Sequence, residues 1–162
     1  MILQSLVKRY EDTGEDSRGW QPRLVDYAIN LDSNGDVLEI IDLTKPDGKK
    51  RVRRTLMLPE KPRGKTSGIK PAFLCDKADY LFGVDPKRGK EKWKKSAELH
   101  HDVLSTAESE DAQALLRYFS RQRKAETLAE TGIYVFMVNG RFVHENRKVI
   151  NAWDSYRATS VS

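Results

Sequence analysis

Three tight-turn sequences constrain the fold of this 162-residue chain more than any other feature, because each separates two stretches suited to β-strands. They end in Asn34-Gly35, Asp47-Gly48 and Asn139-Gly140. Asparagine or aspartate followed by glycine favours the left-handed backbone that a short hairpin turn requires. The chain is therefore predicted to contain antiparallel strands joined by short turns.

The stretches beside these turns have the apolar alternation expected of strands. Residues 24–31, 37–43 and 51–58 lie around the first two turns and predict a three-stranded antiparallel meander. Residues 133–138 and 141–144 flank the third turn and predict a C-terminal hairpin with a type I′ turn.

Helical spacing of apolar residues predicts about four helices. One covers residues 2–11, and another begins after Ser109, which is a suitable N-cap. The apolar stripes of the other two contain Trp93, Ala97, His100 and Leu104 in one helix and Val149, Ile150 and Trp153 in the other.

Short apolar runs at residues 73–75 and 80–82 predict two further strands. Strands and helices in this order are typical of the α+β class, with an antiparallel sheet made of the meander and the C-terminal hairpin. The chain length lies within the roughly 100–200 residues of an ordinary domain, so residues 1–162 are expected to form a single domain.

Positive charge is concentrated in the middle of the chain. Residues 45–95 hold 17 basic and six acidic side chains, a net charge of +11, whereas the remaining residues carry −6. Such a distribution suits a polyanion that approaches from one side. An ordinary solvated face is the alternative explanation.

Residues 64–70 form a glycine-rich segment inside this basic region, with the sequence Gly-Lys-Thr-Ser-Gly-Ile-Lys. Glycines let backbone N–H groups approach a ligand closely, and short hydroxyls add donors, so the segment suits phosphates or the minor groove of DNA. A solvated connecting loop is the alternative. The upstream glycine of a nucleotide-binding P-loop is absent, so that motif is not predicted.

No set of catalytic or metal-binding residues stands out in the sequence. His100 and His101 are adjacent, so on a helix they point about 100° apart and do not bind one metal ion together. His100 lies on an apolar stripe and Cys75 in an apolar run, and both are interpreted as core residues. We expect no catalytic residue, no metal and no cofactor.

The chain also lacks the features of an exported or membrane protein. No apolar run approaches the roughly 20 residues of a transmembrane helix, and the start at Met1 does not resemble a signal peptide. With a single cysteine, Cys75, no internal disulfide is possible. We expect a cytoplasmic protein without a membrane partner.

Several separated blocks resemble, in the same order, the N-terminal part of the large subunit of the CRISPR type I-C Cascade surveillance complex. The most specific are Thr66–Ile69, Phe73–Asp76 and Tyr80–Gly83. The remaining blocks are Met1–Val7, Tyr10-Glu11, Gly19-Trp20, Val25–Leu31, Glu98–His101, Val143–Glu145 and Ala152-Trp153.

The resemblance implies a non-enzymatic role in CRISPR antiviral defence. The large subunit of such complexes reads the short protospacer-adjacent motif on double-stranded DNA and helps to start unwinding, and the guide RNA then reads the sequence by pairing. The implied partners are double-stranded target DNA, the guide RNA ribonucleoprotein, other Cascade subunits and a recruited helicase-nuclease.

The chain departs from the family pattern in two respects. Members of the family continue well beyond the position of Ser162, so the chain is expected to be the N-terminal part of a longer large subunit. Many relatives carry asparagine where this chain has Ala72. If that side chain contacts DNA in the relatives, this chain lacks the contact.

The candidate DNA-binding residues fall into two groups. Thr66, Ser67, Gly68 and Ile69 follow from the motif match, and the basic residues follow from charge alone. Those expected near the motif are Lys65, Thr66, Ser67, Gly68, Ile69 and Lys70. Those expected on the DNA backbone are Lys49, Lys50, Arg51, Arg53, Arg54, Lys61 and Arg63.

Two other functions are weighed against motif recognition. An assembly subunit would use the basic face to touch guide RNA and neighbouring Cascade proteins without reading a motif. A small nuclease is disfavoured, because no carboxylate or histidine cluster has the spacing of a metal site.

Overall fold

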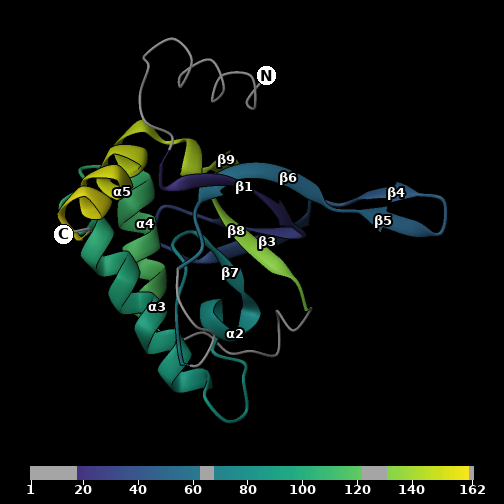
Figure 1. Ribbon diagram of the computed structural model, residues 1–162, viewed down its shortest axis with the longest axis horizontal. Helices are drawn as coiled ribbons and strands as arrows, with labels where there is room; N and C mark the ends of the chain where they lie inside the picture. Colours follow the sequence, from purple (N-terminus) through teal and green to yellow (C-terminus); the bar gives the residue numbers. More distant parts are fainter. Residues whose placement is uncertain (1–17, 63–67, 122–130, 161–162) are drawn as a thin grey trace.

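A five-stranded mixed sheet forms the centre of the protein in the computed structural model, which describes residues 18–62, 68–121 and 131–160 (Figure 1). Its strands are β3 (Val37–Asp42), β2 (Tyr27–Leu31), β8 (Ile133–Val138), β7 (Cys75–Lys77) and β9 (Arg141–Phe142). The order is β3-β2-β8-β7, and β9 also pairs with β8. The predicted helix over residues 2–11 lies outside the described residues.

The predicted C-terminal hairpin is present as β8 and β9. Asn139 (φ 49°) and Gly140 (φ 80°) both have the left-handed backbone that a type I′ turn needs. The second strand of the hairpin is shorter than predicted, because residues 143–145 form a 3₁₀ helix, η2 (Val143–Glu145).

β8 pairs in parallel with β2, which differs from the purely antiparallel expectation. A parallel pair needs a long crossover, and the segment between these strands supplies one, with three α-helices in its described part. Sequence alternation does not distinguish the two directions, since side chains point to alternate faces in both.

The predicted meander is wrong in its connectivity. Residues 24–31 are two strands, because the chain bends at Asp26 between β1 (Trp20–Val25) and β2. β1 pairs with β6 (Arg54–Pro59) to form a separate two-stranded ribbon, so the third predicted strand returns to β1 rather than to β3.

Asp26 gives the physical reason for this bend. Its carboxylate accepts the Ile133 N–H (2.8 Å) and a bidentate contact from Arg53 (3.0 and 3.1 Å). Its backbone carbonyl also accepts the Leu43 N–H. The bend is therefore fixed by partners far away in sequence, and it lets one chain segment pass from the ribbon to the central sheet.

Residues between β3 and β6 form an arm. β4 (Lys45–Asp47) and β5 (Lys50–Val52) pair only with each other, and every residue from Lys45 to Thr55 is exposed. Figure 1 shows this β-arm (residues 45–52) projecting away from the rest of the protein. The predicted turn at Asp47-Gly48 is confirmed as its tip, with Gly48 at φ 62°.

Four α-helices occur among the described residues: α2 (Ala78–Leu81), α3 (Gly89–Leu104), α4 (Glu110–Phe119) and α5 (Arg147–Ser160). The predicted cap of α4 is confirmed, because Ser109 Oγ accepts the Ala112 N–H (3.4 Å). The strand predicted at residues 80–82 is wrong. Phe82 N–H bonds to the carbonyl of Ala78, which makes the run the end of α2.

The strand predicted at residues 73–75 is wrong for all but Cys75, since β7 begins there. Leu74 has φ +63°, which breaks the extended backbone immediately before β7. A run of three apolar residues carries no periodicity that would separate strand from helix or turn.

The core has a large and a small part on the two faces of the sheet. Ile29, Leu31, Phe136 and Val138 belong to the large part, together with the buried residues of α3, α4 and α5. Their sequence neighbours Ala28 and Val135 belong to the small part under the β1–β6 ribbon. The α+β class is confirmed, with helices on one face of the sheet and the ribbon on the other.

Candidate nucleic-acid interface

The structure separates the predicted DNA-binding residues into two described groups. Lys49, Lys50, Arg51, Arg53 and Arg54 lie on or beside the β-arm. Lys61 and the stretch from Gly68 to Lys70 flank residues 63–67. The predicted residues Arg63, Lys65, Thr66 and Ser67 lie outside the described residues.

Arg51 of the β-arm and Arg53 beside it make contacts within the fold. Arg51 Nη2 pairs with Asp42 Oδ2 (2.9 Å), and Arg51 Nε donates to Thr44 Oγ1 (2.6 Å). Hydrogen bonds from Thr44 and the charge of Arg51 lower the pKa of Asp42. Arg53 pairs with Asp26, as described above. These contacts hold the root of the β-arm to the body.

Arg54 and the two arm lysines differ from these arginines. The Arg54 guanidinium lies over the Phe142 ring, 5.4 Å from its centroid. Lys49 and Lys50 are exposed at and beside the tip. The end of the β-arm therefore presents positive charge to solvent, and its root is fixed by ion pairs.

The described residues on both sides of positions 63–67 are tied to the body. On one side the Lys61 N–H donates to Gln21 Oε1 (3.4 Å). On the other side the Lys70 N–H donates to Tyr80 Oη of α2 (3.1 Å). Gly68 has φ +118°, a conformation that L side chains rarely adopt, which explains glycine at this position of the matched block.

The residues that follow Lys70 form a rigid support. The Ala72 N–H donates to Asp76 Oδ2 (2.8 Å), and the Leu74 N–H donates to His100 Nε2 (3.0 Å). Leu74 holds its positive φ at a cost of about 1–2 kcal/mol. The bond to His100 offsets this cost, so a buried residue of α3 fixes the backbone close to the glycine-rich segment.

His100 is a satisfied core residue, as predicted. Its Nδ1 lies 2.7 Å from the carbonyl oxygen of Ser96, which assigns the proton to Nδ1 and leaves Nε2 to accept from Leu74. Its ring stacks on Phe119, with centroids 4.3 Å apart. Burial lowers the pKa of His100 to about 4, so the ring is neutral near pH 7.

A pocket of about 380 Å³ lies at the base of the glycine-rich segment. Lys61 and Pro62 line one side, Pro71 and Ala72 another, and residues of α3 and α5 complete it. Ala72 is therefore in the pocket wall.

A further group of cations lies at the start of α3, and none of its residues is among the predicted DNA-binding residues. This α3 basic cluster consists of the exposed residues Lys87, Arg88, Lys90, Lys94 and Lys95. Of these residues, Lys90 lies in the first turn of α3, where a cation opposes the helix dipole by about 0.3–1 kcal/mol. That conflict is the signal by which the sequence could have identified the cluster.

The α3 basic cluster and the β-arm point in different directions. In Figure 1 the β-arm extends to the right of the view, whereas α3 begins at its lower end. The expectation of one continuous basic face over residues 45–95 is therefore replaced by two separate basic surfaces.

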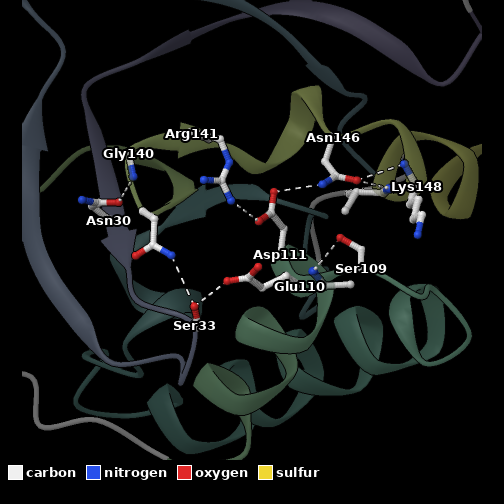
Figure 2. A network of polar contacts seen from close by, with 12 residues as sticks. Asn30, Ser33, Ser109, Glu110, Asp111, Gly140, Arg141, Asn146 and Lys148 are labelled. Atoms are coloured by element: carbon white, nitrogen blue, oxygen red, sulfur yellow. Dashed lines mark hydrogen bonds and ion pairs between the residues drawn. The ribbon is translucent and has the colours of Figure 1, made fainter.

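A polar network on another side of the sheet connects the hairpin turn to α4 and α5 (Figure 2). Asp111, almost fully buried, accepts from Arg141 Nη2 (3.3 Å) and from Asn146 Nδ2 (3.0 Å). Asn30 Oδ1 accepts the Gly140 N–H (2.9 Å). These contacts fix the packing of strands on helices.

Nucleophiles and histidines do not gather into a reactive arrangement in the described part of the chain. Burial raises the pKa of Cys75 to about 12 and lowers the pKa of His144 to about 3. No group of three or more potential metal ligands was found among residues 18–62, 68–121 and 131–160. None of the helices described is long and apolar enough to cross a bilayer.

Comparison with known protein families identifies a match. The family model described as CRISPR-associated protein (Cas_Csd1) matches residues 6–162, which is nearly the whole chain. No curated protein matches the chain.

Proposed function

The chain belongs to the CRISPR-associated Cas_Csd1 family, and we propose from this premise that it recognises the protospacer-adjacent motif in double-stranded DNA. Family membership makes it a Cascade-associated subunit. Within the complex, its part is to bind the duplex at the motif and to help start unwinding for guide RNA pairing. It acts without catalysis, in the cytoplasm, and a separate helicase-nuclease cuts the DNA.

The observation that carries this proposal is the anchoring beside the glycine-rich segment. The Lys70 N–H is bonded to Tyr80, and the Leu74 N–H is bonded to the buried His100. Reading bases requires donors at fixed positions, whereas phosphate contacts need only positive charge nearby. The anchors at Lys70 and Leu74 fix the described backbone beside the block, which supports this part of the proposal.

The basic surfaces supply the positive charge that phosphate contacts require. Lys49 and Lys50 at the β-arm and Lys61 beside the pocket are exposed and suited to the DNA backbone. Such contacts position the duplex and accelerate the search for the motif, but they carry no sequence information. Lys65, Thr66, Ser67 and Gly68 would then approach the base edges.

The test is a titration of the full Cascade complex with short duplexes that contain or lack candidate motifs, over a salt series. We expect tighter binding to one motif and a steep decrease of affinity with salt. Lys65→Ala with Lys70→Ala should weaken binding by about 1–3 kcal/mol in total. Arg147→Ala is the control, because it removes an exposed cation of α5.

Equal affinity of the wild-type complex for every duplex would contradict motif recognition. It would favour the assembly role, in which the basic surfaces contact guide RNA and neighbouring subunits. A loss of affinity in the Arg147→Ala control as large as in the double variant would show that the segment has no special part in binding.

A further inference from the structure

The α3 basic cluster is placed where its charges repel one another and the helix end. Lys90 and Lys94 are four residues apart and therefore adjacent on the helix surface. Glu91 is the only acidic residue from Lys87 to Lys95. The N-cap residue of α3, Arg88, makes no capping hydrogen bond through its side chain.

Helix α4 has the opposite arrangement of charge at its start. Ser109 caps α4, and Glu110 and Asp111 occupy its first turn, where carboxylates are favourable. Asp85 takes the place of that cap in α3, because its carboxylate accepts the Lys87 N–H (2.9 Å) and the Arg88 N–H (3.3 Å). The exposed cations at the start of α3 still repel one another, and an anionic partner would relieve that repulsion.

Contacts connect the start of α3 to the anchored end of the glycine-rich segment. Lys92, on the same turns of α3, pairs with Asp85 (2.6 Å) and Asp79 (3.3 Å), and its ammonium lies 5.5 Å from the centroid of the Tyr80 ring. The Oη atom of Tyr80 accepts the Lys70 N–H. Lys92 is therefore used to hold α2 against α3, and the five cluster residues remain directed to solvent.

We propose that the α3 basic cluster binds the phosphate backbone of the duplex immediately beside the motif. This inference rests on the proposed function, because Lys70 is the described end of the segment that would read the motif. A duplex held at Lys70 lies next to the start of α3 through the Tyr80–Lys92 contact. The β-arm, which points elsewhere, contacts a different stretch of nucleic acid.

The charge of the cluster fits duplex DNA among polyanions. Duplex DNA carries about one phosphate charge per 1.7 Å of its axis, and each phosphate neutralised by a protein cation contributes about 0.9 to the slope of log affinity against log salt. Cations on successive helix turns are about 5.4 Å apart along the axis, so several phosphates lie within reach of the cluster.

The test uses the full Cascade complex with Lys90→Glu and Lys94→Glu combined. We expect the affinity for motif-containing duplex to fall about 10- to 100-fold and the salt slope to flatten by about 2, since two phosphate contacts are lost. The affinity for motif-free duplex should fall by the same factor, because phosphate contacts are independent of sequence. Thermal unfolding should occur at about the same temperature, because both side chains are exposed and a carboxylate at position 90 suits the first turn of α3.

Arg147→Glu is the control. It reverses one exposed cation in the first turn of α5, so its effect is compared with that of the cluster variant per charge reversed. Lys90→Gln with Lys94→Gln is the second variant, which removes charge without reversing it and should give a smaller loss of the same kind. Unchanged affinity and slope in both cluster variants, or an equal loss per charge reversed in the control, would overturn the proposal.

Two further results separate this proposal from the proposed function. If the wild-type complex has no motif preference but the cluster variants still flatten the slope, motif reading fails and the duplex contact stands. If the variants keep duplex affinity but their complexes contain less guide RNA, the cluster binds RNA and the proposal is overturned.

Discussion

Replacement of His100 by phenylalanine tests the support beneath the glycine-rich segment. The aromatic ring is retained, so stacking on Phe119 and on Phe73 persists in outline. The change removes the acceptor of the Leu74 N–H and the donor to the Ser96 carbonyl. Leu74 then keeps its positive φ without the bond that offsets it.

The expected loss follows from these contacts. A buried N–H without an acceptor costs about 1–3 kcal/mol, and the lost bond to Ser96 adds about 1 kcal/mol. His100→Phe should therefore lower the free energy of unfolding by about 2–4 kcal/mol near pH 7. His101→Phe, on the exposed side of the same helix, should change it by less than about 0.5 kcal/mol.

The pH dependence gives an independent check. Burial lowers the pKa of His100 to about 4, from an unperturbed value of about 6.5, so the unfolded chain binds more protons between these values. The stability that neutral His100 contributes is complete above about pH 6.5 and is lost as the pH falls toward 4. The loss is about 3 kcal/mol, because each pKa unit corresponds to about 1.4 kcal/mol.

The variant lacks this titration, so its deficit relative to wild type should shrink as the pH decreases. Burial raises the pKa of Asp76 to about 6, which acts in the opposite direction, but Asp76 is present in both proteins and cancels in the comparison. Urea unfolding between about pH 7 and pH 5 measures the difference, and exchange of the Leu74 amide measures the local effect. Parallel pH curves, or an unchanged Leu74 amide, would refute the reasoning.

Three other outcomes can be checked. Asp26→Ala should destabilise the protein by about 2–3 kcal/mol in urea unfolding, because the Ile133 N–H and Arg53 lose their acceptor, whereas Asp42→Ala, at an exposed pair, should have little effect. Ala72→Asn places an amide at the pocket wall and should raise the affinity of the complex for motif-containing duplex up to about 10-fold, with unchanged binding as the contrary result. Plasmid incubated with the chain and Mg²⁺ or Mn²⁺ should remain intact on a gel.

Local patterns predicted the elements that local forces determine. The type I′ turn at Asn139-Gly140 and the cap at Ser109 depend on residues adjacent in sequence, and both are confirmed. The break of residues 24–31 at Asp26 depends on Ile133 and Arg53, which are distant in the chain. The alternation of apolar and polar residues continues through this bend. A single meander was therefore predicted, whereas β1 and β2 belong to two different sheets.

The candidate site was predictable in composition but not in arrangement. Charge counting correctly placed exposed cations around Lys49 and Lys50, and the block match indicated the segment that ends at Lys70. The separation of the β-arm from the α3 basic cluster depends on how α2 and α3 pack. The contact between Tyr80 of α2 and Lys92 of α3 joins these helices, and no sequence pattern indicates it.

The structure also changes which charges are available to a polyanion. Arg51 is already paired with Asp42 and Arg53 with Asp26, so a phosphate would have to compete with a carboxylate for each. Lys50 is exposed in the same β-arm and forms no ion pair with another described residue. Lys50→Gln should therefore flatten the salt slope of duplex binding by about 0.9, and Arg51→Gln by less. If the two substitutions have equal effects, net charge alone governs binding, and the internal ion pairs do not restrict which cations reach the phosphates.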